Sequence, residues 1–264
     1  MPRRKFGWRE TVKRTQLGWG IVHLRNTVRA FYRGEIYGRD YSNPSSPALQ
    51  PATPNWLEEY FDAHKTGRGL WKWRHYFPIY DRHFSKFRGR EVHIVEIGIF
   101  AGGSLDMWKA YFGDQVHIYG VDVEPSCRVY EGDGIRVFIG DQADKIFWKQ
   151  FVEEVPRIDI IVDDGGHQFH QQVATFEALL PHLQPGGVYL CEDVCQRSNP
   201  FHDYCNGLAR NLSDYSPSEE VAPSIFQREI DSIHLYPYVA VVEKRADLLE
   251  RFESSKHGTE WQPF

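Results

Sequence analysis

The stretch EVHIVEIGIFAGGS, residues 91–104, decides the fold of this chain. It opens with an apolar run, Val92–Ile97, and continues into a loop that holds three glycines. A short apolar run before such a loop predicts a buried strand, and glycine lets the backbone turn sharply and lets a ligand approach it. Residues 104–112 then predict a helix, whose first turn offers free N–H groups. The stretch therefore predicts a strand, a ligand-binding loop and a helix.

Strands and helices keep alternating beyond this unit. We expect further strands at residues 116–121, 135–139, 158–162 and 187–191. We expect further helices at residues 145–152, 168–183 and 200–213. Residues 232–235 and 238–243, on either side of a Tyr-Pro turn, predict a closing hairpin. Apolar strands that alternate with helices predict an α/β fold, with a mostly parallel sheet covered by helices on both faces.

Four regions follow from the pattern along the chain. They are a basic N-terminal arm and linker at 1–50, a helical cap at 51–90, the main α/β domain at 91–250 and a tail at 251–264. In the cap we expect one helix at 55–65, with Asn55 as its N-cap, and a second helix at 71–85, where aromatic side chains are crowded.

The arm is strongly basic. Residues 1–40 carry ten Lys or Arg against three acidic residues, so the arm is positive while the rest of the chain is negative. Ile21, Leu24, Val28 and Phe31 recur at helical spacing, which predicts an amphipathic helix. The favoured interpretation is a helix that docks on the main domain or on another subunit. The alternative is an arm that contacts an acidic surface or a membrane face.

Composition limits the class of protein. The hydrophobic share of 41% and the charged share of 25% are ordinary for a globular chain. The net charge of −5 gives no general argument for nucleic acid, and we expect no such partner. No apolar run approaches the roughly 20 residues of a membrane span, and the N-terminus lacks a signal-peptide core. Four cysteines without a disulfide or zinc pattern predict free thiols in a reducing compartment, the cytoplasm.

Polar residues stand at the ends of the first three expected strands. Glu96 precedes the glycines, which suits a ligand with a cationic amino group better than one with a pyrophosphate. The loop also lacks the G-x-G-x-x-G spacing of nicotinamide sites. Asp122 at the second strand end can accept hydrogen bonds from ribose hydroxyls. Asp141 and Gln142 at the third can hold an adenine edge. Carboxyl ends of parallel strands share one rim, so these residues predict a single ligand site.

Acidic residues also follow the fourth and fifth strands. Asp164 stands after the fourth, and Glu192 and Asp193 stand after the fifth. If the two strands are neighbours, the three carboxylates converge and repel each other unless a positive charge lies between them. Ligation by oxygen alone suits Mg²⁺, Mn²⁺ or Ca²⁺. The alternative is that one or two of them cap the following helices.

His167 lies three residues after Asp164, within reach of the same opening. An imidazole with an ordinary pKa near ~6.5 can accept a proton at neutral pH. A hydroxyl held on a divalent ion loses its proton more easily. We therefore expect His167 to deprotonate a substrate hydroxyl, whose oxygen then acts as the nucleophile. His170, one turn further, is the alternative base.

Six segments in order resemble the metal-dependent sugar O-methyltransferases of macrolide biosynthesis, of the mycinamicin and macrocin type. They are VEIGIFAGGSLDMW (95–108), YGVD (119–122), GDQ (140–142), IVDDGGH (161–167), LCEDV (190–194) and SIHLY (232–236). Two departures stand out. The second glycine of DDGGH is commonly Ser in that family, and the basic arm has no recognisable counterpart there.

The resemblance implies a Rossmann-like class I methyltransferase fold with a seven-stranded sheet and a C-terminal hairpin. It implies S-adenosylmethionine and Mg²⁺ (or Mn²⁺) as cofactors. The expected cofactor contacts are Glu96, Gly98, Ser104, Asp122, Asp141 and Gln142. The expected metal ligands are Asp164, Glu192 and Asp193, with Asp164 and His167 as the catalytic pair.

The expected activity is methylation of a hydroxyl on a sugar, glycoside or polysaccharide, by an enzyme that assembles as a homo-oligomer. One alternative is methylation of a non-sugar natural product. Another is a hydroxylase related to the cephalosporin 7-hydroxylase branch, which should require iron and a His-rich ligand set. A third is a binding module without catalysis, because a fold alone does not determine function.

Overall fold

The structure is a computed structural model that describes residues 16–42, 53–195, 199–214, 222–255 and 257–258. The chain separates into two compact units, Met1–Ala52 and Thr53–Phe264. The predicted linker after residue 42 and the end of the predicted tail lie outside the described residues. In the part of the chain that the structure describes, no helix is long and apolar enough to cross a membrane.

The first unit contains one described helix, α2 (Gln16–Asp40). It covers the segment in which Leu24, Val28 and Phe31 recur, so the predicted arm helix is confirmed. What this helix docks against stays a prediction.

The second unit is built on a seven-stranded sheet. Its strands are β1 (Val92–Ile97), β2 (Val116–Asp122), β3 (Ile135–Ile139), β4 (Ile158–Asp163), β5 (Leu183–Cys191), β6 (Ile230–Tyr236) and β7 (Val239–Lys244). Their order across the sheet is β3-β2-β1-β4-β5-β7-β6. The first five are parallel, and β7 and β6 add an antiparallel hairpin beside β5. This confirms the predicted fold.

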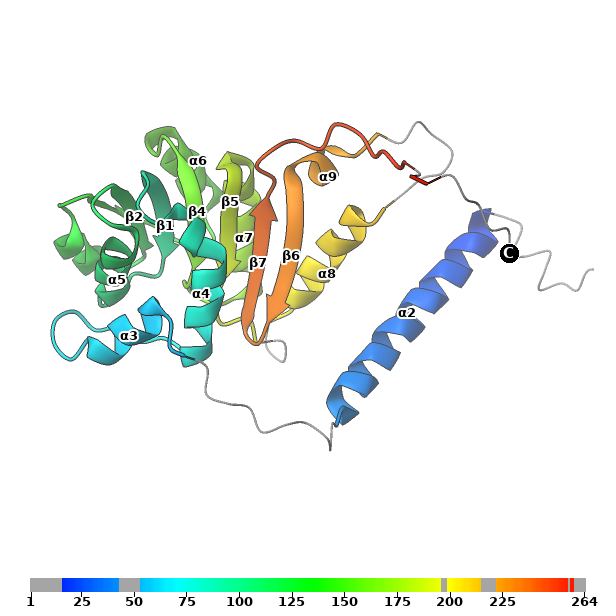
Figure 1. Cartoon of the computed structure of the whole chain (residues 1–264), viewed down its shortest axis with the longest axis horizontal. Coiled ribbons are helices and arrows are strands. Elements are labelled where there is room, and N and C mark those ends of the chain that lie inside the picture. Colours follow the sequence, from blue (N-terminus) through cyan, green and yellow to red (C-terminus); the bar gives the residue numbers. More distant parts are fainter. Residues whose placement is uncertain (1–15, 43–52, 196–198, 215–221, 256, 259–264) are drawn as a thin grey trace, which may run out of the picture. The chain divides into compact units, whose positions relative to one another are not determined.

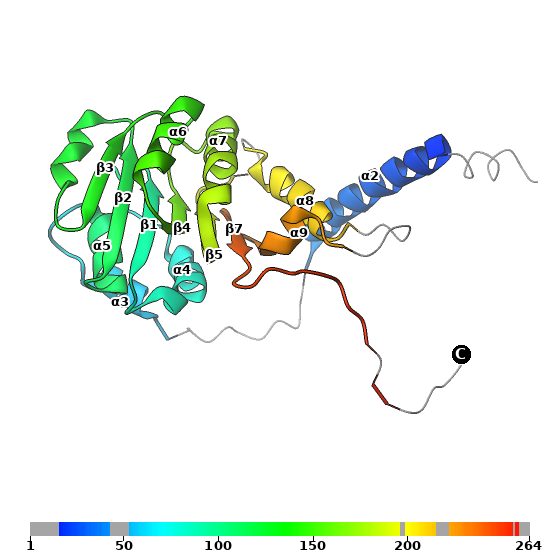
Figure 2. The same ribbon diagram turned by 90° about the horizontal axis from the view of Figure 1, so that it is seen from above.

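Helices cover both faces of the sheet (Figures 1 and 2). One face carries α3 (Trp56–Ala63), α4 (Phe77–Phe84) and α5 (Gly103–Phe112), and the other carries α6 (Lys145–Glu154), α7 (Phe169–Leu179) and α8 (Phe201–Leu212). Strand side chains alternate between the faces, so Ile94 packs with Trp108 in one core while Val95 packs with Phe176 in the other. A short helix, α9 (Ile225–Glu229), precedes β6 and was not predicted.

The cap begins as predicted but departs from the prediction further on. Asn55 is the N-cap of α3, and its side chain accepts a hydrogen bond from the Glu58 amide at 3.0 Å. The single helix predicted at 71–85 is wrong at its start. Residues 71–73 are not helical, and a 3₁₀ turn, Arg74–Tyr76, leads into α4. Pro78 lacks an N–H and is tolerated only in the first turn of an α-helix, which is where it lies in α4, so a helix that started at 71 could not continue through it undistorted.

The hairpin holds α4 by a buried polar contact. His83 of α4 lies 3.2 Å from the Glu243 carboxylate on β7 and 3.0 Å from the Tyr236 hydroxyl on β6. Lys86 reaches the same carboxylate at 3.2 Å. The hydrogen bond from His83, helped by the charge of Lys86, lowers the pKa of Glu243 to about 2. The cap and the sheet edge are therefore fastened together.

Two glycines of the loop after β1 permit close backbone approaches. Gly98 has a φ of +84°, and a Cβ there would lie 2.1 Å from the carbonyl oxygen of Asp164. A Cβ at Gly103 would lie 2.2 Å from the carbonyl oxygen of Gly69, to which the Gly103 amide donates a hydrogen bond at 3.1 Å. The second contact ties the segment before α4 to the start of α5.

We expect Gly103→Ala to lower the free energy of unfolding by about 1–3 kcal/mol, because the new methyl group would overlap the backbone at Gly69. The matched control is Gly207→Ala in α8, where nothing lies within 4 Å of the added Cβ. That change should stabilise by about 0.5–1 kcal/mol, as alanine does in helices. Urea unfolding of both variants measures the change in the free energy of unfolding. Equal changes in the two variants would contradict a close approach of Gly103 to Gly69.

Glu243→Gln should lower the melting temperature at neutral pH. The depressed pKa of Glu243 means that its charge stabilises the fold above the unfolded pKa near ~4.3 and loses this effect as pH falls towards 2. The difference between variant and parent should therefore shrink below about pH 4. Thermal scans over pH 3–7 measure it, with Glu153→Gln on the exposed face of α6 as control. A difference that stays constant with pH would refute the assignment.

Candidate cofactor and metal site

A hollow of about 950 Å³ opens at the carboxyl ends of β1, β2, β4 and β5. This is the edge at which parallel α/β sheets bind ligands. Most of the predicted site residues line it, together with the segment before α4. They are Gly98, Ser104, Asp122, Asp141, Gln142, Asp164, His167, Glu192 and Asp193. The structure therefore brings these residues to one cavity.

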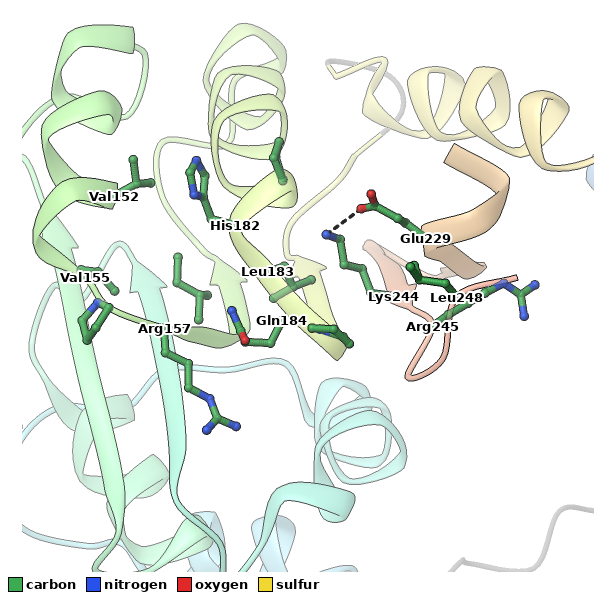
Figure 3. Close-up of a pocket in the computed structure, with 14 residues that line it drawn as sticks. Val152, Val155, Arg157, His182, Leu183, Gln184, Glu229, Lys244, Arg245 and Leu248 are labelled. Atoms are coloured by element: carbon green, nitrogen blue, oxygen red, sulfur yellow. Dashed lines mark ion pairs between the residues drawn. The ribbon is translucent and has the colours of Figure 1, made fainter. Parts of the chain in front are cut away.

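A second hollow, of about 520 Å³, lies at the opposite edge of the sheet, where β4 and β5 begin (Figure 3). Arg157 and Leu183 line it, and Lys244 pairs there with Glu229 at 3.0 Å. None of the predicted site residues lines this hollow. The larger cavity is therefore the candidate site.

Asp122 and Asp141 are held at the cavity by backbone amides. The Asp122 oxygens accept from the Phe100 amide at 3.0 Å and from the Glu124 amide at 2.9 Å. Asp141 accepts from the Ala143 amide at 2.8 Å. Each carboxylate oxygen has further lone pairs, so both groups keep the capacity to accept hydrogen bonds from ligand hydroxyls or amines.

Gln142 lines the cavity, but its side chain is already engaged. Its amide donates to Asp163 at 2.6 Å, and its carbonyl oxygen accepts from the Gly166 amide at 3.0 Å. The side chain is 6% exposed. The Gln142 side chain connects the turn after β3 to the turn after β4. Its hydrogen bonds to Asp163 and Gly166 therefore compete with the expected contact to an adenine edge.

Glu96 differs from the expectation more clearly. It is fully buried on β1 and does not line the cavity. Its carboxylate oxygens are buried, and the polar groups beside them are the side chains of Ser104 and Trp108. Burial raises the pKa of Glu96 to about 7, and the nearby charge of Lys72 opposes the rise. The Glu96 carboxylate therefore does not face the cavity, but its charge acts on Lys72.

The predicted convergence of β4 and β5 is present. The two strands are paired in parallel with Asp163 opposite Cys191, so Asp164 and Glu192 leave the sheet next to each other. A cation from the cap lies between them. The Lys72 ammonium donates to Asp164 Oδ2 at 2.6 Å and to both oxygens of Glu192 at 3.0 and 2.9 Å. The sequence did not predict this contact.

The Lys72 side chain is only 3% exposed. Burial acts to lower its pKa, but the surrounding carboxylates, first that of Glu192, outweigh burial and hold the pKa above its ordinary value. Burial and the charge of Asp164 in turn raise the pKa of Glu192. Three carboxyl groups, those of Glu192, Asp164 and Glu96, act on this one lysine charge. The cluster keeps an excess of negative charge.

Two tyrosines of the cap complete the cluster. The Tyr76 hydroxyl donates to Asp193 at 2.5 Å, and the Tyr80 hydroxyl donates to Glu192 at 2.6 Å. Burial, and then the neighbouring carboxylates, raise the pKa of both phenols, so the hydroxyls stay protonated donors. They hold the acidic side chains in place.

His167 faces the same carboxylates from the turn before α7. Its Nε2 lies 3.9 Å from Asp164 Oδ1 and 3.7 Å from Asp193 Oδ2. One possible ligand atom from each of these three residues lies within 4.8 Å of the others, whereas the Glu192 carboxylate accepts hydrogen bonds from Lys72 and Tyr80. The geometry therefore groups His167, rather than Glu192, with the two aspartates.

The backbone is bent at both rim residues. His167 has a φ of +55° and Asp193 a φ of +52°, the left-handed region that few non-glycine residues adopt. Asn199 steadies the first bend by donating to the His167 carbonyl oxygen at 2.9 Å. Tyr76 steadies the second, because the Asp193 amide donates to its hydroxyl at 3.3 Å. Such strain persists only where the surroundings impose it.

Sequence reasoning missed the roles of Lys72, Tyr76, Tyr80 and Asn199. The crowding of polar and aromatic residues around 71–84 was the available signal for the first three. It did not show which strand end they reach, because a predicted helix at 71–85 would direct their side chains differently. Asn199 follows β5 without any motif that marks it.

A family model described as Methyltransferase domain matches residues 95–194. The mycinamicin VI 2''-O-methyltransferase of Micromonospora griseorubida is 35% identical over 194 residues, which cover 64% of this chain and 48% of that protein. The demethylmacrocin O-methyltransferase of Streptomyces fradiae is 33% identical over 198 residues, which cover 66% of this chain and 50% of that protein. The chain spans about half the length of these curated relatives.

A solved structure of the MycE methyltransferase from the mycinamycin biosynthetic pathway, in complex with Mg, SAH and mycinamycin VI, is similar with a TM-score of 0.59. The match is 30% identical and covers 72% of this chain and 52% of that chain. The chain therefore carries a methyltransferase domain of the Rossmann-like class I fold, and over that domain it resembles the sugar O-methyltransferases of macrolide biosynthesis.

Proposed function

We propose that this chain is an S-adenosylmethionine-dependent O-methyltransferase that acts on a hydroxyl group of a sugar-bearing substrate. In the reaction a new C–O bond forms to the methyl carbon, the C–S bond of the sulfonium breaks, and the hydroxyl proton leaves to a base. The observation that carries the proposal is the cluster of Asp164, Glu192 and Asp193 beside His167 at the edge of a large cavity. The named activities of the relatives support it.

The residues of the cluster fit a hard divalent ion. They offer carboxylate oxygens, which Mg²⁺ and Mn²⁺ prefer, and their negative charge exceeds that of the one lysine among them. Asp164, Glu192 and Asp193 would hold the ion. When bound, it would lower the pKa of a substrate hydroxyl by stabilising the oxyanion.

His167 is the proposed base. Its Nε2 faces the carboxylates, and 37% of the side chain is exposed at the cavity, so a substrate hydroxyl can reach it. The nearest carboxylate oxygens to this nitrogen are those of Asp193 at 3.7 Å and Asp164 at 3.9 Å. Asn199 keeps the histidine backbone in position.

Trp71 and Trp73 support a sugar-bearing acceptor. They line the cavity and are 88% and 56% exposed, so their flat apolar faces are available to a ring-shaped substrate. The identity of the sugar, a homo-oligomeric assembly and a cytoplasmic location belong to the same proposal. The carboxylate-rich rim does not favour the iron-dependent hydroxylase alternative.

Chelation with EDTA should abolish methyl transfer to a permissive glycoside, and added Mg²⁺ should restore it, because the acidic cluster needs a divalent ion to act on the hydroxyl. Transfer from radiolabelled S-adenosylmethionine measures the effect, which we expect to be at least a hundredfold. Full turnover under thorough chelation would contradict the metal role. Tightly held iron together with a hydroxylated product would favour the hydroxylase instead.

His167→Ala should lower turnover by about 10²–10⁴-fold, the usual contribution of a general base, while affinity for S-adenosylmethionine changes little. The comparison variant is His170→Ala, which removes the alternative base one turn away on α7. Calorimetry gives the cofactor affinity and single-turnover kinetics give the rate. Loss of activity in the second variant rather than the first would move the base to His170.

A further inference from the structure

Lys72 holds an unusual position for a lysine. It lies in the segment 69–73, outside any helix or strand, yet its side chain is 3% exposed. Its ammonium contacts Asp164 at 2.6 Å and Glu192 at 2.9 Å. Burying an ammonium is costly unless it is paired and hydrogen-bonded, as it is here. Lys72 is thus a specific internal partner of two proposed metal ligands.

The ammonium and a divalent ion would compete for the same oxygens. Mg²⁺ binds carboxylate oxygens at about 2.1 Å, so an ion on Asp164 Oδ2 and Glu192 Oε2 would overlap the place that Lys72 Nζ takes. Two cations in contact with one buried pair of carboxylates also repel each other strongly. Lys72 and the ion therefore exclude one another from this pair.

An ion on the remaining oxygens would not leave the proposed reaction intact. Asp164 Oδ1 and Asp193 Oδ2 lie 3.9 and 3.7 Å from His167 Nε2. An ion centred there would take the nitrogen that should accept the proton, and hard ions prefer oxygen. It would also lack the carboxylate of Glu192. Binding by all three acidic residues thus needs Lys72 to move.

The surroundings of Lys72 allow such a movement. Lys72 lines the cavity, as do the exposed side chains of Trp71 and Trp73 on either side of it. Lys72 itself lies outside any helix or strand, and the backbone of the segment is anchored by the hydrogen bond between Gly69 and Gly103 at 3.1 Å. A rotation of the lysine side chain would carry its ammonium into the cavity without displacing α4.

We infer that Lys72 is a built-in counter-cation, which a divalent ion must displace from Asp164 and Glu192 before these residues can hold it. The inference rests on the proposed function in that the ion is the one used in methyl transfer. In this arrangement the acidic residues stay paired in the fold, and metal entry releases a positive charge into the substrate cavity.

The first test is Mg²⁺ titration by calorimetry of the full chain and of Lys72→Met, which keeps an unbranched side chain, one atom shorter, and removes its charge. We expect at least tenfold tighter Mg²⁺ binding by the variant. Lys149→Met, at an exposed position on α6, is the matched control and should bind like the parent. Unchanged or weaker binding by Lys72→Met would overturn the inference while leaving the proposed function standing.

A second test uses the unaltered chain, in case the variant fails to fold. An amine-acylating reagent, followed by peptide mass spectrometry, should label Lys72 much more slowly than Lys149. Saturating Mg²⁺ should raise the labelling rate of Lys72 at least fivefold and leave Lys149 unchanged. If Lys72 is labelled at the same slow rate with and without bound Mg²⁺, the ion does not displace it and the inference is wrong. If calorimetry finds no Mg²⁺ binding to the parent, the proposed metal dependence falls, and this inference falls with it.

Discussion

The parallel pairing of β4 and β5 places negative charges where they repel. Asp163 lies opposite Cys191 in the register, so the next residues, Asp164 and Glu192, leave the sheet side by side. Burial strengthens their repulsion and adds the cost of removing each carboxylate from water. A positive charge must therefore come from outside the sheet, and Lys72 supplies it. The cap places this lysine between the two carboxylates.

The cap is accordingly a part of the site rather than an attachment to it. Its contacts reach the rim at successive points, through Lys72 and through the hydroxyls of Tyr76 and Tyr80. At the far end of α4, His83 fastens the helix to Glu243 on the hairpin. Strand β7, which carries Glu243, thus indirectly supports the residues that face the cavity. A shift of α4 would disturb the acidic cluster and the hairpin together.

Apolar runs and the acidic residues that end them are local features, so the strands, their parallel order and the convergence of Asp164 with Glu192 could be predicted. The partner of these acids could not, because Lys72 is distant from them in sequence and lies in a segment outside any helix or strand. Gln142 shows the same limit. Its position at a strand end was predictable, whereas its engagement by residues of the next turn depends on tertiary packing.

The left-handed bends at His167 and Asp193 narrow what evolution can place at either position. Besides glycine, the residues most often found in that conformation are Asn, Asp and His. The residues that can accept a proton or bind a metal ion through oxygen are largely the same types. The backbone conformation and the chemistry therefore favour the same residues at the two positions. A β-branched or bulky residue would be excluded by its poor fit to the left-handed conformation, whatever its reactivity. We therefore expect the substitutions tolerated at these two positions to be limited to a few polar residue types.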